Sequence, residues 1–140
     1  MKFKVLIVAA NYYKNYSNSL IFCAKKKLEN LPKLKNKSGV MKFRSNLIEV
    51  PGAFEIPVVI SKNVHKYDGF LALGCIIKGK TPHFDFISQS INNALIDLSI
   101  NYKKPIGNGI ITCLSRKQAD ERKCKKGLEA AFAVMSVLSN

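Results

Sequence analysis

The sequence predicts an α/β fold, a three-layer sandwich in which a four-stranded parallel sheet carries helices on both faces. Four short apolar runs rich in β-branched residues have the pattern of strands buried on both faces. Segments with helical periodicity alternate with these runs, which is the arrangement that parallel βαβ units produce. The chain of 140 residues shows no repeat, linker or low-complexity segment, so we expect one domain over residues 1–140.

The first half of the chain predicts two strands, each followed by a helix. Residues 3–10 are continuously apolar and are predicted as the first strand. Residues 17–31 follow as a helix with Ser17 as its N-cap. Residues 40–50 are predicted as the second strand, and a Pro-Gly turn then leads into a helix within residues 51–67.

The second half continues the same alternation. Residues 68–77 are predicted as the third strand, residues 81–102 as a long helix and residues 105–114 as the fourth strand. Residues 115–123 begin with a capping box, Ser-x-x-Gln, and residues 127–138 are predicted as the final helix. The strand order expected for such a chain is the flavodoxin-like 2-1-3-4.

The formal charge of +14 suits a nucleic-acid partner, but its distribution favours another interpretation. The lysines are scattered, and no arginine-rich or aromatic-interleaved motif accompanies them. We therefore expect a solvated basic surface, no nucleic-acid partner and an attraction for phosphorylated small molecules. No apolar run reaches membrane-spanning length, and the first apolar run is interpreted as a strand, so a cytoplasmic protein without a membrane partner is expected.

The four cysteines, Cys23, Cys75, Cys113 and Cys124, form no C-x-x-C pair, and no histidine lies at zinc-ligand spacing. They are interpreted as free thiols in a reducing compartment, without a metal. Cys75 and Cys113 lie on predicted apolar strands, so packing is their expected role.

Ligands of such sheets bind beyond the carboxyl ends of the strands. These ends are residues 10–13, 50–55, 75–83 and 108–115, which are expected to form one rim. Within the third segment, Thr81 suits an N-cap, and the adjoining glycine and lysines favour an anion site.

His83 follows this anion site in the first predicted turn of the long helix. A neutral imidazole there can accept a proton and return it, although an exposed histidine without a role fits equally well. The same two interpretations, ligand binding or an ordinary structural place, are open for the other polar and aromatic residues of the rim. These are Tyr12 and Tyr13, Glu55, Arg122 and Lys126.

Four blocks of the chain resemble, in order, those of the lumazine synthase family: VPGAFEIP, ALGCIIKGKTPHFDF, NGIITCLSRKQADER and KGLEAAFAVMSVL. The resemblance implies a transferase of riboflavin biosynthesis that condenses 5-amino-6-(D-ribitylamino)uracil with 3,4-dihydroxy-2-butanone 4-phosphate. It implies no metal or organic cofactor, and a homopentamer with active sites between subunits. Residues 121–127 are shorter than the usual connection, which favours a pentamer over the hollow capsids of some members.

The resemblance also implies roles for individual residues. His83 corresponds to the proton-transfer histidine of the family. Four residues correspond to its phosphate-binding groups: Lys80, Thr81, Arg122 and Lys126. Eight residues correspond to groups that hold the ring and the ribityl chain: Tyr12, Ala53, Phe54, Glu55, Cys75, Ile76, Ile77 and Asn108.

Two departures keep other functions open. The family often has Arg-Phe-Asn where this chain has Asn11-Tyr12-Tyr13, and phenylalanine is common at the place of Asn108. A flavin- or lumazine-binding protein without turnover is one alternative, and a basic nucleic-acid-binding domain is another.

Overall fold

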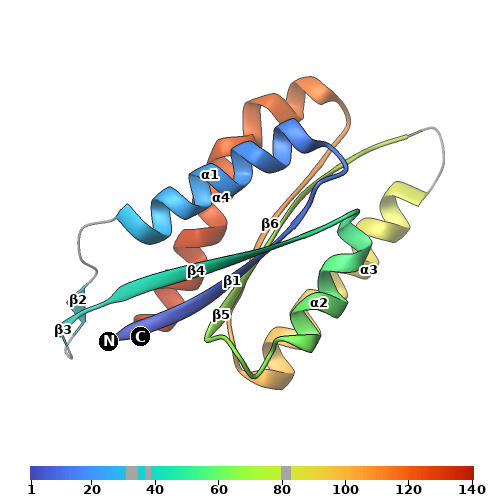
Figure 1. Ribbon diagram of the computed structural model, residues 1–140. Helices are drawn as coiled ribbons and strands as arrows, with labels where there is room; N and C mark the ends of the chain where they lie inside the picture. The colour runs from blue at the N-terminus through green and yellow to red at the C-terminus, as the bar shows by residue number, and fades with distance from the viewer. Residues whose placement is uncertain (31–34, 37–38, 80–82) are drawn as a thin grey trace.

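The computed structural model describes residues 1–30, 35–36, 39–79 and 83–140, and it confirms the predicted α/β architecture (Figure 1). Its main sheet has the order β4-β1-β5-β6, and every pairing in it is parallel. This is the predicted order 2-1-3-4, with strands β1 (Lys2–Ala10), β4 (Lys42–Val50), β5 (Gly69–Ile77) and β6 (Ile106–Cys113). Two short strands, β2 (Lys35–Asn36) and β3 (Gly39–Val40), pair antiparallel apart from this sheet.

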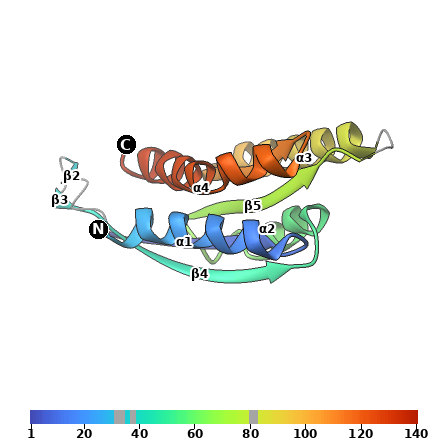
Figure 2. The same cartoon turned by 90° about the horizontal axis from the view of Figure 1, so that it is seen from above.

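Helices cover both faces of the sheet (Figure 1). One face carries α1 (Lys14–Asn30) and α4 (Arg116–Leu138). The other face carries the 3-10 turn η1 (Ala53–Glu55), α2 (Ile56–Lys62) and α3 (His83–Tyr102). Figure 2 shows that α1 and α2 lie toward β4, whereas α3 and α4 lie toward the opposite edge.

The continuous apolar runs of the sequence arise because the central strands are buried on both faces. In β1, Val5 and Ile7 face the α1–α4 layer, whereas Leu6 and Val8 face the α2–α3 layer, and all four are fully buried. A parallel strand in this position has no solvent face, so it lacks the alternation of polar and apolar residues seen in half-exposed strands.

The start of α1 differs from the prediction. The helix begins at Lys14, and Ser17 is therefore a residue of its first turn and not its N-cap. The Tyr13 carbonyl accepts the amide N–H groups of Tyr16 and Ser17, at 3.1 and 3.0 Å. The Ser17 hydroxyl is buried and donates to the Lys14 carbonyl at 3.2 Å. Backbone turn formation at Tyr13 therefore starts the helix three residues earlier than the expected N-cap.

The predicted capping box is present at the start of α4. The Ser115 hydroxyl accepts the Gln118 amide N–H at 3.3 Å, and the Gln118 side chain accepts the Leu114 amide N–H at 2.8 Å. The predicted separate final helix is wrong, because α4 continues without a break from Arg116 to Leu138. Gly127, which the prediction treated as a boundary, lies inside this helix.

Gly127 is needed where α4 crosses α1. A Cβ added at Gly127 would lie 2.6 Å from the Leu20 carbonyl oxygen of α1, which is closer than van der Waals contact allows. The two helices pack extensively along this crossing. The glycine therefore serves close helix packing, and not helix termination.

Cys23 and Cys124 form a disulfide bond that joins α1 to α4, so the prediction of free thiols is wrong for these two residues. Their Cα atoms lie 5.5 Å apart, within the usual range for a disulfide. A sequence separation of 101 residues gives no local sign of such a pair. Cys75 and Cys113 are free, as predicted, and Cys113 is buried.

Reduction of this disulfide should destabilise the protein. A crosslink that closes a loop of 101 residues restricts the unfolded chain, so we expect dithiothreitol to lower the free energy of unfolding by about 2–4 kcal/mol. Urea unfolding at one fixed protein concentration, with and without the reductant, measures this difference. A Cys23→Ser, Cys124→Ser variant is the control and should not respond to the reductant. An equal response in both proteins would contradict the crosslink.

Candidate active site

The carboxyl ends of the four strands meet at one edge of the sheet, as predicted. The register places Ala10 beside Val50 and Ile77 beside Cys113. The pairing extends one residue beyond the strands, because the Asn11 amide N–H donates to the Val50 carbonyl and the Lys78 amide N–H donates to the Cys113 carbonyl, both at 2.9 Å. The segments that follow β1 and β4 therefore start side by side, whereas β5, whose Leu73 pairs with Ala9, continues to Ile77 at the same edge before its segment starts.

Aromatic side chains project into solvent from two of these segments. Tyr12, after β1, is 75% exposed, and its ring lies edge-on to Tyr13 with centroids 4.9 Å apart. Phe54, after β4, is 67% exposed. Apolar rings left in water at a strand-end rim provide surfaces on which a flat ligand ring can stack.

The segment after β4 turns sharply, so that it presents a carboxylate at the rim. Residues Ala53–Glu55 form a single 3-10 turn, and the Glu55 amide N–H donates to the Gly52 carbonyl at 3.2 Å. Glu55 occupies the N-cap position of α2, but its side chain makes no capping hydrogen bond. The Glu55 carboxylate is therefore not used by a capping hydrogen bond, and its oxygens can accept hydroxyl groups of a ligand.

The side chains at the end of β5 face alternate sides of the sheet. Cys75 and Ile77 pack against the α1–α4 layer, whereas Ile76 packs against the α2–α3 layer. Burial, followed by the neighbouring Cys113 thiol, raises the pKa of Cys75 to about 12. Cys75 therefore stays protonated at neutral pH, and its surroundings do not favour a nucleophile.

His83 is the first residue of α3 and is exposed, which agrees with its predicted place in the first turn. Asp85 lies in the same first turn. Lys80 and Thr81, the predicted phosphate-binding residues of this segment, lie outside the described residues. The structure thus places His83 directly after the third rim segment, with its imidazole accessible to a ligand.

Asn108 lies away from the rim, although the predicted fourth rim segment, residues 108–115, includes it. It pairs with Ala72 in the middle of β6, five residues before Cys113 and hence about 16 Å from the end of the strand. Its amide donates to the Asn92 side chain of α3 at 2.9 Å and accepts the Ile110 amide N–H at 3.0 Å. Since β6 is an edge strand, Asn108 is displayed at the side of the protomer.

Arg122 and Lys126 lie one turn apart on α4. The Arg122 guanidinium donates to the Thr112 carbonyl of β6 at 3.4 Å. The two residues, with Lys125 and Glu129, line a shallow hollow of about 300 Å³. Arg122 therefore lies near the carboxyl end of β6 on the α1–α4 face, whereas the Asn108 side chain contacts α3 on the other face.

Prediction from the sequence missed the surroundings of Tyr12. Tyr16, Arg116 and Asp120 line a hollow next to it, although the first two were not expected near the rim. The sequence contained a sign of this hollow, because both α1 and α4 begin with a cationic residue, Lys14 and Arg116. Acidic residues are usual at the start of a helix. Among the residues that the structure describes, no group of three or more His, Cys, Asp or Glu side chains could hold a metal ion.

The fold and the rim define an α/β protein with a small-molecule site at the carboxyl end of a parallel sheet. Residues 2–140 match the family model of 6,7-dimethyl-8-ribityllumazine synthase. The chain belongs to this family of transferases. In the part of the chain that the structure describes, no helix has the length and apolar character needed to cross a membrane.

Curated proteins with the name 6,7-dimethyl-8-ribityllumazine synthase are similar to the chain along most of its length. The protein of Polaromonas sp. is 35% identical over 132 residues, which are 93% of this chain and 81% of the relative. The protein of Bartonella bacilliformis is 38% identical over 144 residues, 96% of this chain and 88% of the relative. The protein of Nitratidesulfovibrio vulgaris is 43% identical over 103 residues, 68% of this chain and 66% of the relative.

Proposed function

We propose that the rim is the active site at which this chain forms 6,7-dimethyl-8-ribityllumazine. It condenses 5-amino-6-(D-ribitylamino)uracil with 3,4-dihydroxy-2-butanone 4-phosphate and releases phosphate and water, a step of riboflavin biosynthesis. The observation that carries this proposal is the family match over residues 2–140. The strand-end location of Tyr12, Phe54, Glu55 and His83 supports it.

The chemistry needs orientation and proton transfer more than a reactive protein group. The primary amine of the uracil attacks the ketone and forms a Schiff base, after which phosphate leaves, the ring closes and water is lost. None of these steps requires a nucleophile from the protein, in agreement with the high pKa of Cys75. Holding the two substrates together in the reactive orientation supplies a large part of the rate.

The predicted site residues have different roles in the reaction. His83 moves protons beside the departing phosphate. Glu55 accepts hydroxyl groups of the ribityl chain, and Tyr12 stacks on the pyrimidine ring. The remaining residues line the substrates or bind the phosphate: Ala53, Phe54, Cys75, Ile76, Ile77 and Asn108 along the ring and chain, and Lys80, Thr81, Arg122 and Lys126 at the phosphate.

The reaction is tested directly by mixing the purified protein with both substrates and recording the fluorescence of the lumazine product. Product formation at a rate that scales with enzyme concentration supports the proposal. A protein that binds the lumazine but forms none from the two substrates would be a binding protein on the same scaffold, and the proposed activity would be wrong.

The active sites lie between neighbouring subunits of a homopentamer. Two observations support this assembly. Asn108 is exposed on the edge strand β6, away from the rim of its own protomer. Phe86, Ile96 and Ile100 on α3 are each more than half exposed, which leaves an apolar helix surface for a partner. Light scattering should give a mass near five times 15.6 kDa, and a monomer would contradict the assembly.

The protein works in the cytoplasm as a single domain over residues 1–140. It needs no metal or organic cofactor and has no nucleic-acid or membrane partner. Activity that survives dialysis against EDTA would support the absence of a metal, whereas loss restored by one metal would contradict it.

Replacement of Arg122 with alanine should weaken use of the phosphorylated substrate. Loss of a charge-assisted contact with phosphate is expected to raise the KM for 3,4-dihydroxy-2-butanone 4-phosphate by about tenfold or more. The KM for the uracil substrate should change little. Arg44→Ala, on the exposed strand β4, is the control and should behave as the parent protein. An unchanged KM for the phosphorylated substrate in Arg122→Ala would exclude the phosphate role.

A further inference from the structure

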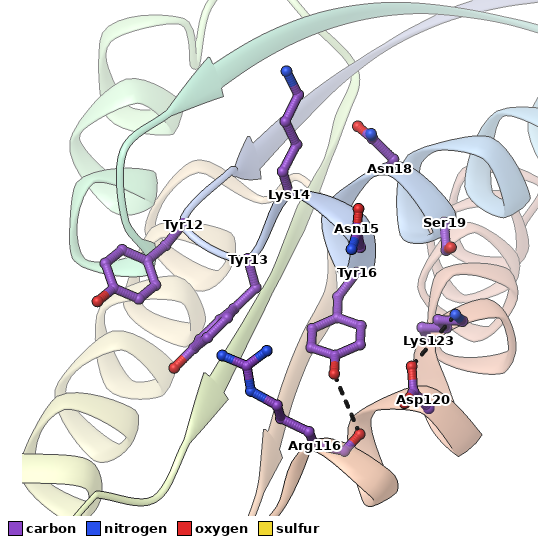
Figure 3. Close-up of a pocket in the computed structure, with 10 residues that line it drawn as sticks. All are labelled: Tyr12, Tyr13, Lys14, Asn15, Tyr16, Asn18, Ser19, Arg116, Asp120 and Lys123. Atoms are coloured by element: carbon purple, nitrogen blue, oxygen red, sulfur yellow. Dashed lines mark hydrogen bonds and ion pairs between the residues drawn. The ribbon is translucent and has the colours of Figure 1, made fainter.

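A pocket of about 830 Å³ opens between the first turns of α1 and α4 (Figure 3). We call it the α1–α4 pocket. The residues that line it come from the segment after β1, from α1 and from α4: Tyr12, Tyr13, Lys14, Asn15, Tyr16, Asn18, Ser19, Arg116, Asp120 and Lys123. Only Tyr12 among them belongs to the predicted active site. The pocket therefore lies on the α1–α4 side of the sheet, whereas His83 and Glu55 belong to elements of the other side.

The pocket has an excess of positive charge. Lys123 pairs with Asp120 at 3.5 Å, so these two charges offset each other. Within the described residues, no carboxylate forms an ion pair with Arg116 or Lys14. Both residues stand at the first position of a helix, neither helix has an acidic residue in its first turn, and the helix dipole is unfavourable for a cation there. An anion in the pocket would remove this mismatch.

Aromatic rings lie beside the unpaired guanidinium. In Figure 3, the Arg116 side chain reaches toward the Tyr13 ring, whereas the Lys14 side chain points away from Arg116. The Arg116 guanidinium lies 5.6 Å from the centroid of Tyr13, and the rings of Tyr13 and Tyr16 are 6.0 Å apart. The Tyr16 hydroxyl donates to the Arg116 carbonyl at 3.4 Å, which links the first turns of the two helices. The pocket wall thus places the Tyr13 ring next to the Arg116 guanidinium.

We propose that the α1–α4 pocket binds a phosphate monoester that carries a flat ring. Arg116 would bind the phosphate, Lys14 would add positive charge at the edge of the pocket, and the ring would lie against Tyr13. A volume of about 830 Å³ is in the range of small-molecule sites and is far larger than a lone phosphate needs, which is why the ligand carries a ring. The pocket shares Tyr12 with the proposed active site, but its proposed ligand-binding residues, Arg116, Lys14 and Tyr13, have no role in the proposed activity.

The experiment is calorimetric titration of the purified full chain, in its assembled state, with phenyl phosphate and with inorganic phosphate. All proteins carry Arg122→Ala, so that the predicted phosphate group of the active site is weakened. We expect phenyl phosphate to bind more tightly than inorganic phosphate. Arg116→Ala should weaken both about tenfold, and Lys14→Ala, an exposed position, should weaken both in the same direction. Tyr13→Leu should weaken phenyl phosphate alone.

Lys26→Ala is the matched control, because Lys26 is exposed on α1 and does not line the pocket. Its affinities should equal those of the Arg122→Ala parent. Circular dichroism establishes that each variant is folded before titration. No binding of phenyl phosphate to the parent would overturn the proposal. Equal affinities in the Lys14→Ala, Arg116→Ala and Lys26→Ala variants would overturn it too, since the ligand would then occupy another place.

Discussion

Replacement of His83 with alanine should lower kcat by about 100-fold or more without abolishing turnover. The expected loss is partial because the substrates remain bound and oriented, and water can move protons slowly in place of the imidazole. Both KM values should stay within a few fold of those of the parent protein. Steady-state kinetics with each substrate varied in turn, followed by lumazine fluorescence, measures the three parameters.

His65→Ala provides the control for this variant. His65 is the second histidine of the chain, is exposed, and lies edge-on to Tyr102 with ring centroids 5.7 Å apart, away from the rim. Its kcat should equal that of the parent. If His83→Ala retained full activity, His83 would have no part in proton transfer, although the family assignment and the fold would stand.

Replacement of Gly127 with alanine should destabilise the protein strongly. Glycine-to-alanine changes inside a helix usually stabilise by about 1 kcal/mol, because alanine has the higher helix propensity. Here the new Cβ would lie 2.6 Å from the Leu20 carbonyl oxygen, so α1 and α4 would have to move apart. We expect a net loss of about 2–3 kcal/mol in the free energy of unfolding, measured by urea denaturation at fixed protein concentration.

Gly79→Ala is the matched change at an open position. Apart from its chain neighbours, no atom of the described residues lies within 4 Å of a Cβ added at Gly79, so its effect on stability should be within about 0.5 kcal/mol. A Gly127→Ala protein that is as stable as the parent, or more stable, would show that the two helices can separate at no cost.

The order of strands and helices was predictable because burial on both faces leaves a simple signal. Runs such as residues 3–10 are apolar throughout, and the helices between them have clear periodicity. The capping box at Ser115 was equally visible, since both of its side chains are local in sequence. The rim followed from the topology, because parallel strands place all their carboxyl ends at one edge.

Features that depend on contacts between distant segments were not predictable. Gly127 was predicted to begin a separate final helix, because only the packed structure shows the Leu20 backbone against it. The Cys23–Cys124 bond has the same origin, since the packing of α1 on α4 brings the two residues together.

Only part of the site was predictable, because some of its residues depend on contacts between distant segments. Rim residues such as His83 could be placed from strand ends alone. The position of Asn108 required the register of β6 against β5, which no sequence pattern contains. The hydrogen bond from Asn108 to Asn92 also joins two elements that are remote in sequence until they pack.

The packing of α1 against α4 has a consequence for synthesis on the ribosome. Helix α1 packs against α4, the last element, and the sheet face under these two helices is fully covered only when both are present. A nascent chain that ends before Arg116 exposes the apolar side chains of β1 and β5 on that face. Productive folding therefore waits for the final helix to leave the exit tunnel, and chaperones that hold emerging apolar segments have their substrate here.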